Sequence, residues 1–136
     1  GPRCRPVDAP RGSGTAVSAY FISFAHPELS RRLHEALSNT GRRSIFGFSG
    51  VREYGPGHSG LGDVNAGPIV LGISVGASGF ALGSARANGD RDLYRELYRT
   101  TSLFGVPAPR GGKRNFLMGG LLGDALLLAM LTARPS

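Results

Sequence analysis

Apolar and polar positions divide the chain into two kinds of segment that alternate. Residues 11–25 and 68–85 carry almost no charge and are apolar on nearly every side of a helix, which predicts helices buried all round. Residues 26–37 and 90–104 have leucines four positions apart with charged residues between them, which predicts amphipathic helices. A last apolar segment begins at Asn115 and predicts a further buried helix.

The first two pairs of segments form a weak internal repeat with an offset of 64 residues. Leu29 matches Leu93 and Leu33 matches Leu97, so each unit is a predicted helical hairpin. Val and Ile never alternate with polar residues over a useful length, so no strand is predicted. Alternating buried and amphipathic helices are typical of an α/α toroid or an α-solenoid. We therefore predict an all-α fold, with residues 1–136 as a single helical domain.

Helix ends and glycines refine this prediction. Pro68 is suited to the first position of the third helix, and Asp90 to the N-cap of the fourth. A glycine stripe on the third helix is expected from the spacings of four, three and four residues between Gly72, Gly76, Gly79 and Gly83. Such a stripe predicts close helix packing, with room for a ligand as the alternative.

Charge and cysteine content narrow the classes of function. The formal charge is +7, but the fifteen Arg and one Lys are scattered and not clustered with aromatic residues, so we do not expect nucleic-acid binding. Cys4 has no second cysteine with which to form a disulfide, so no oxidising compartment is indicated and a cytoplasmic location is expected. The chain has no start Met, which suggests a piece of a larger protein.

Membrane association is the alternative location. Residues 68–85 are eighteen uncharged residues with small residues at four-residue spacing, the minimum for a transmembrane helix. The amphipathic segments on either side could not cross a bilayer because they carry several arginines and carboxylates. Asp124 also interrupts the last apolar segment, and there it requires a partner such as Ser74 or Ser78, or a polar cavity.

The candidate site is the glycine-rich stretch VREYGPGHSGLGDVNAGP, residues 51–68. Glu53 and Asp63 are a candidate acid/base pair, since two carboxylates in different environments can divide into proton donor and acceptor. The candidate substrate-binding residues are Arg52, Tyr54, His58 and Asn65. The alternative is an ordinary connection in which Asp63 or Asn65 caps the helix expected near Pro68.

Other chemistry has less support in the sequence. Glu53, His58 and Asp63 have irregular spacing and no second histidine nearby, so we predict no metal site and no cofactor. His26 is placed at a helix entry and His34 on an outer helix face, and neither is assigned a role.

Several stretches taken together resemble a known group of bacterial proteins. They are RGSGTAVSAYF, HPELSRRL, GVREYGPG, DVNAGPIVLGISVGASGFALGSARANGD and GDALLLAM. They resemble the C-terminal portion of the linalool dehydratase/isomerase-like group. The resemblance implies part of an α/α toroid like that of six-hairpin glycosidases, with residues 52–68 facing a central cavity. It also implies cofactor-independent acid/base addition or removal of water at an alcohol or alkene. The catalytic motifs of the named enzyme cannot be placed on this sequence.

Two classes of function follow from these observations. The first is a fragment of a toroid enzyme, lyase-like or glycosidase-like, acting on a small molecule through Glu53 and Asp63. The second is a non-catalytic helical-repeat or membrane-associated scaffold. In either case three hairpins would leave apolar helices uncovered, so we expect the chain to self-associate or to pack against the rest of a larger toroid.

Overall fold

The computed structural model describes residues 8–62, 66–117 and 120–134. The first half contains α1 (Gly12–Ile22), α2 (Pro27–Ala36), a π-helical turn η1 (Leu37–Gly41), β1 (Arg42–Ile45) and β2 (Phe48–Arg52). The second half contains β3 (Ile69–Val70), β4 (Ile73–Ser74), α3 (Val75–Ala87), α4 (Arg91–Phe104), β5 (Pro107–Arg110), β6 (Lys113–Phe116) and α5 (Gly120–Thr132).

The predicted all-α class is wrong, because the fold is mixed α and β. An antiparallel four-stranded sheet has the order β1-β2-β4-β3, and β5 pairs with β6 in a separate hairpin. The strands also rule out the prediction of a toroid built of helical hairpins, because the two helical units are joined through a sheet. The amphipathic helices predicted at residues 26–37 and 90–104 are confirmed as α2 and α4.

Tight two-residue turns make short strands possible here without hydrophobic alternation. Phe46 and Gly47 both have positive φ, and so do Leu71 and Gly72, as type I′ hairpin turns require. Gly111 and Gly112 form the same kind of turn between β5 and β6. These hairpins replace the first turns of the helices predicted from Pro68 and from Asn115.

The third helix therefore begins at Val75 and not near Pro68. Ser74 is its N-cap, with Oγ accepting the Ala77 amide at 2.9 Å and donating to the Ala66 carbonyl at 2.7 Å. No helix begins near Pro68 for Asp63 or Asn65 to cap, and both of these residues lie outside the described residues. Asp90 does cap α4, as predicted, by accepting the Leu93 amide at 3.0 Å.

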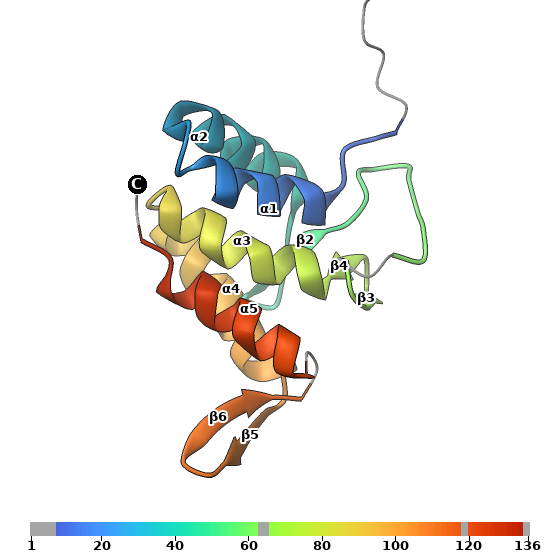
Figure 1. Ribbon diagram of the computed structural model, residues 1–136. Coiled ribbons are helices and arrows are strands. Elements are labelled where there is room, and N and C mark those ends of the chain that lie inside the picture. Colours follow the sequence, from blue (N-terminus) through green and yellow to red (C-terminus); the bar gives the residue numbers. More distant parts are fainter. Residues whose placement is uncertain (1–7, 63–65, 118–119, 135–136) are drawn as a thin grey trace, which may run out of the picture.

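The helices form two layers (Figure 1). α1, α3 and α5 lie side by side and run in the same direction, with α3 in contact with both of the others. α2 and α4 run the opposite way behind α1 and α3. The core between the layers includes Leu82 of α3 with Leu93 and Leu97 of α4.

We call α1, α3 and α5 the front layer, and Gly83 of α3 lies where side chains of both neighbouring helices come close to the α3 backbone. A Cβ at Gly83 would overlap Met130 Sδ of α5 and lie 3.1 Å from Tyr20 Cδ2 of α1, so both neighbours meet over this residue. One turn earlier, a Cβ at Gly79 would have no atom within 4 Å. The close packing predicted for the glycine stripe is thus confirmed at Gly83, whereas Gly79 has open space beside it and Gly72 lies in a turn outside the helix.

Candidate functional site

Glu53 follows directly after β2 and its carboxylate is bound to the first turn of α1. Ser13 donates its amide to Glu53 Oε2 at 3.1 Å and its hydroxyl to Oε1 at 2.7 Å. The Gly12 amide donates to the Glu53 carbonyl at 2.9 Å. Arg11, the N-cap residue, makes no side-chain capping bond. Glu53 instead accepts the Gly12 and Ser13 amides, two of the N–H groups that a helix leaves unpaired at its start.

This arrangement explains why an acidic side chain is buried at Glu53. Its side chain is 1% exposed, and a buried carboxylate is tolerated only when hydrogen bonds compensate for its desolvation. A Cβ at Gly12 would overlap the Arg52 carbonyl oxygen, so the chain needs glycine where α1 approaches β2. Glu53 therefore fixes α1 on the sheet, and both of its oxygens are occupied.

Arg52 and Tyr54 flank Glu53 and are half-buried. The Arg11 guanidinium lies over the Tyr54 ring, 5.7 Å from its centre. The Tyr54 hydroxyl would lie 2.5 Å from a Cβ at Gly60, so the ring packs closely against the long loop after β2. Arg52 Nε is buried and donates no hydrogen bond within the described residues.

His58, another predicted site residue, bonds within its own loop and not to Glu53. His58 is exposed, and its Nδ1 lies 3.3 Å from the Pro56 carbonyl of its own loop. Asp63 and Asn65 lie outside the described residues, so the predicted pairing of Glu53 with Asp63 stays a prediction. Among the described residues no group of three His, Cys, Asp or Glu side chains could hold a metal ion.

A second polar cluster, which the sequence analysis missed, joins three helices. His34 of α2 lies 2.9 Å from Ser84 Oγ of α3 through Nδ1, and 3.0 Å from Asp90 Oδ2 at the start of α4 through Nε2. These are the residue types of a nucleophilic triad. Ser84, however, is 0% exposed near the end of α3, so its hydroxyl is closed off from a substrate. The cluster holds α2, α3 and α4 together.

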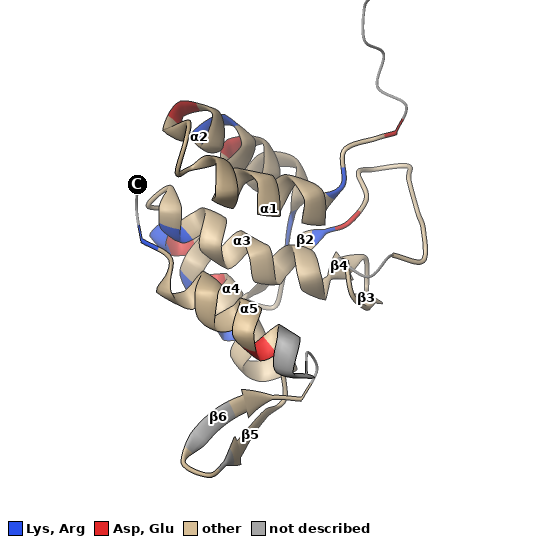
Figure 2. Ribbon diagram, viewed as in Figure 1, with Lys and Arg blue, Asp and Glu red and all other residues tan. Residues whose placement is uncertain are grey.

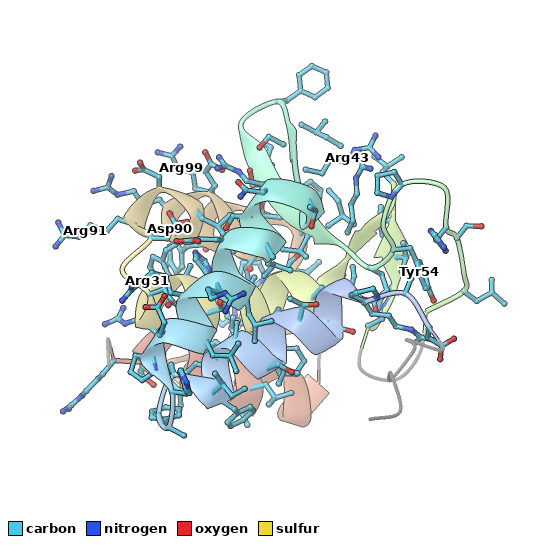
Figure 3. The ribbon with its side chains drawn as sticks, turned by 90° about the horizontal axis from the view of Figure 1, so that it is seen from above. Arg31, Arg43, Tyr54, Asp90, Arg91 and Arg99 are labelled. Carbon is cyan, nitrogen blue, oxygen red and sulfur yellow. The ribbon has the colours of Figure 1, made fainter. Side chains whose placement is uncertain are left out.

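Several interactions set the charge of Asp90. Burial raises the pKa of this carboxyl, but the hydrogen bonds from the Leu93 amide and from His34, with the charges of His34 and Arg42, lower it by more. Its pKa therefore lies below the ordinary value. Figure 3 shows Asp90 and Tyr54 at opposite ends of the molecule, so the two polar clusters are separate.

Asp124 also has a structural partner. Its Oδ1 accepts the Phe116 amide at 2.7 Å, which ties α5 to β6. Neither serine proposed as its partner is used, since Ser74 bonds to Ala66 and Ser78 donates to the Ser74 carbonyl.

The front layer presents a surface with little charge (Figure 2). α1 contains no charged residue, and Arg86 and Asp124 are the only ones in α3 and α5. Arg86 donates to the Ala133 carbonyl and stacks on Tyr94, so both charges bond within the chain. We call this surface the uncharged face, and it comprises Gly14, Phe21, Phe24, Gly79, Gly123 and Leu126. Phe21 and Phe24 are 59% and 66% exposed.

Comparison with known proteins assigns no family. No protein-family model matches the sequence, and no curated protein matches it. The resemblance to the linalool dehydratase/isomerase-like group therefore stays a prediction. In the described part of the chain no helix is long and apolar enough to cross a bilayer.

Proposed function

We propose that this chain is an assembly module, whose uncharged face binds an apolar, uncharged surface of a protein partner. The observation that carries the proposal is the exposure of Phe21 and Phe24 on a layer whose two charged side chains bond internally. Large exposed apolar patches on soluble domains mark interaction sites. Catalysis has weaker support, because the Glu53 carboxylate is buried and both of its oxygens bond to Ser13 at the start of α1.

Exposed apolar side chains occur on α5 as well as on α1. Leu126 and Leu128 of α5 are 38% and 63% exposed.

Retention on a neutral matrix bearing phenyl groups tests the proposal without assuming a partner. We expect the chain to be retained at moderate salt, and the variant Phe21→Ser/Phe24→Ser to elute early. The matched control is Phe46→Ser, which removes a phenyl group that is 98% exposed at the β1–β2 turn, away from the uncharged face. Equal retention of the native chain and the Phe21/Phe24 variant would contradict the proposal.

A second candidate function is acid/base catalysis at the loop after β2. The observation in its favour is Arg52 Nε, a buried donor without an acceptor in the described residues, beside the loop that carries Asp63 and Asn65. A buried unpaired donor calls for an explanation, and an oxygen-rich small molecule would supply the acceptor. The reaction would be of the hydro-lyase or glycosidase type, with Asp63 as acid or base.

The variant Asp63→Asn tests this second candidate. Alcohol dehydration, alkene hydration and glycoside hydrolysis would be assayed with the native chain, and the variant should lose any such activity while keeping its unfolding midpoint. Activity that persists in Asp63→Asn would exclude Asp63 from the reaction. A lower midpoint without an activity change would give Asp63 a structural role.

A further inference from the structure

The uncharged face has two unlike halves along the direction of its helices. In the second half, Tyr20 and Met130 meet over Gly83, and Phe21 of α1 and Phe24, which follows α1, are exposed. In the first half, a Cβ added at Gly14, Gly79 or Gly123 would have no atom within 4 Å. Because α1, α3 and α5 run in the same direction, the open positions share one end and the filled ones the other (Figure 1).

We infer that the partner of the uncharged face is a second copy of this chain, turned end for end; this inference rests on the function proposed above. A two-fold axis lying in the interface, perpendicular to the helices, places α1 against α1 of the other copy in antiparallel orientation. Phe21 and Phe24 of one copy then lie over Gly14 of the other. The filled half of each layer meets the open half of its partner, as an isologous interface requires.

Charge favours a second copy over other occupants. A chain with a charge of +7 repels its own copies through most surfaces, and the uncharged face is the exception. Figure 3 shows Arg91 and Arg99 on α4, on the side of the molecule away from α5. Two copies joined through the uncharged face therefore keep these arginines apart.

A membrane surface fits less well. Peripheral helices that lie on bilayers carry Lys and Arg beside their apolar residues. Here α1 has no basic residue between Gly12 and Ile22, and Arg31, Arg91 and Arg99 project from α2 and α4. The occupant that matches an uncharged face is another uncharged protein face.

The size of the face fits a small, reversible dimer interface of about 1,000 Å² in total. Helices of 13 residues are about 20 Å long, and three of them packed 8–10 Å apart cover on the order of 500 Å² in projection. Side-chain relief raises the accessible area above that projection. A standard interface takes about 800 Å² from each partner.

Sedimentation equilibrium over a concentration series tests the inference with the full chain. We expect a monomer–dimer equilibrium, weakened at least about tenfold by Gly79→Leu, because leucine fills the open half. The substitution should leave the fold intact, since a Cβ at Gly79 would meet no atom of a neighbouring element within 4 Å. The control is Arg32→Leu on the exposed side of α2, which should leave the dissociation constant unchanged.

Cross-linking tests the orientation. Val17 lies midway between Gly14 and Phe21, close to the two-fold axis, so Val17→Cys in a Cys4→Ser background should be joined to its own copy by a short thiol cross-linker. Arg32→Cys in the same background should not be joined. A dimer that Gly79→Leu does not weaken, or in which Val17→Cys is not joined, would overturn the end-for-end arrangement.

Two further outcomes separate this inference from the function on which it rests. A chain that stays monomeric but is retained on phenyl groups through Phe21 and Phe24 would overturn the second copy and leave the assembly module standing. A monomer that sediments with neutral phosphatidylcholine vesicles, and no longer does so after Phe21→Ser/Phe24→Ser, would replace the second copy with a membrane surface. A monomeric chain that is not retained on phenyl groups would overturn both proposals, because a dimer buries the face and only a monomer leaves it free to bind.

Discussion

Glu53 and Ser13 are 40 residues apart in the sequence, yet the Glu53 carboxylate accepts both the amide and the hydroxyl of Ser13. This contact attaches the start of α1 to the end of β2. It therefore couples the front helical layer to the sheet, and its loss should affect the stability of the whole fold.

We expect Glu53→Ala to lower the free energy of unfolding by about 2 to 4 kcal/mol, because the amide of Ser13 is left buried without an acceptor. Urea denaturation followed by circular dichroism measures this change. Glu35→Ala, on the exposed side of α2, is the control and should change stability by no more than about 0.5 kcal/mol. A double-mutant cycle with Ser13→Ala should give a coupling energy of about 1 to 3 kcal/mol, and a value near zero would contradict the contact.

Gly12 and Gly14 offer a matched pair on the same helix. Gly12→Ala should destabilise the protein by about 2 to 4 kcal/mol, because the added methyl meets the Arg52 carbonyl, which is backbone and cannot move aside. Gly14→Ala should be neutral or stabilising by up to about 1 kcal/mol, since nothing lies within 4 Å of its added methyl. Thermal unfolding of both variants would show whether α1 approaches β2 this closely.

Gly83→Ala should destabilise the front layer by about 1 kcal/mol, although alanine favours a helix. The added methyl overlaps Met130 Sδ and crowds Tyr20, and this overpacking outweighs the gain in helix propensity. Shortening the neighbour in a Met130→Ala background should make Gly83→Ala nearly neutral. If Gly83→Ala costs the same in both backgrounds, α5 does not pack on Gly83.

Asp90 should make stability depend on pH at the acid end. Its pKa is lower in the folded chain than the ordinary value of 3.8, so the folded state favours the ionised carboxylate. The stabilisation is present above the unfolded pKa and is lost as the pH falls through the folded pKa. Asp90→Asn keeps a capping side chain but cannot ionise, so its urea midpoint should fall less than that of the native chain between about pH 5 and pH 3. Identical pH profiles would contradict this role.

Phe46 has a φ of 50° at the tip of the β1–β2 hairpin, a conformation that costs a phenylalanine free energy. Phe46→Asn should stabilise the protein by about 1 kcal/mol, because asparagine adopts positive φ more easily. Phe46→Ala is the control, since it removes the same phenyl group and retains the unfavourable φ. Equal stability of the two variants would show that the turn is not strained.

Local patterns in the sequence predicted the amphipathic helices well. α2 and α4 have leucines at helical spacing, and Asp90 is a readable N-cap. The strands were missed because β3 and β4 have two residues each and turn at Leu71–Gly72, without the asparagine that usually signals such a turn. The Gly-Gly pair at 111 and 112 was a usable hairpin signal.

The long-range contacts of the polar clusters could not be predicted from the sequence. Glu53 was recognised as an unusual carboxylate, but its partner Ser13 has no local signature that connects the two. The same holds for His34 and Ser84, which are 50 residues apart and meet only because α2 packs near α3. Contacts of this kind depend on how the layers are arranged, and that arrangement depends on the sheet.

The common direction of α1, α3 and α5 also gives the front layer an electrical polarity. Each helix carries a dipole with its positive end at the N-terminus, so three parallel helices concentrate partial positive charge at one end of the layer and partial negative charge at the other. When a second copy is turned end for end, each helix lies against a helix of the other copy whose dipole points in the opposite direction. The orientation that matches filled halves to open halves is therefore also the orientation that lets the two layers neutralise each other.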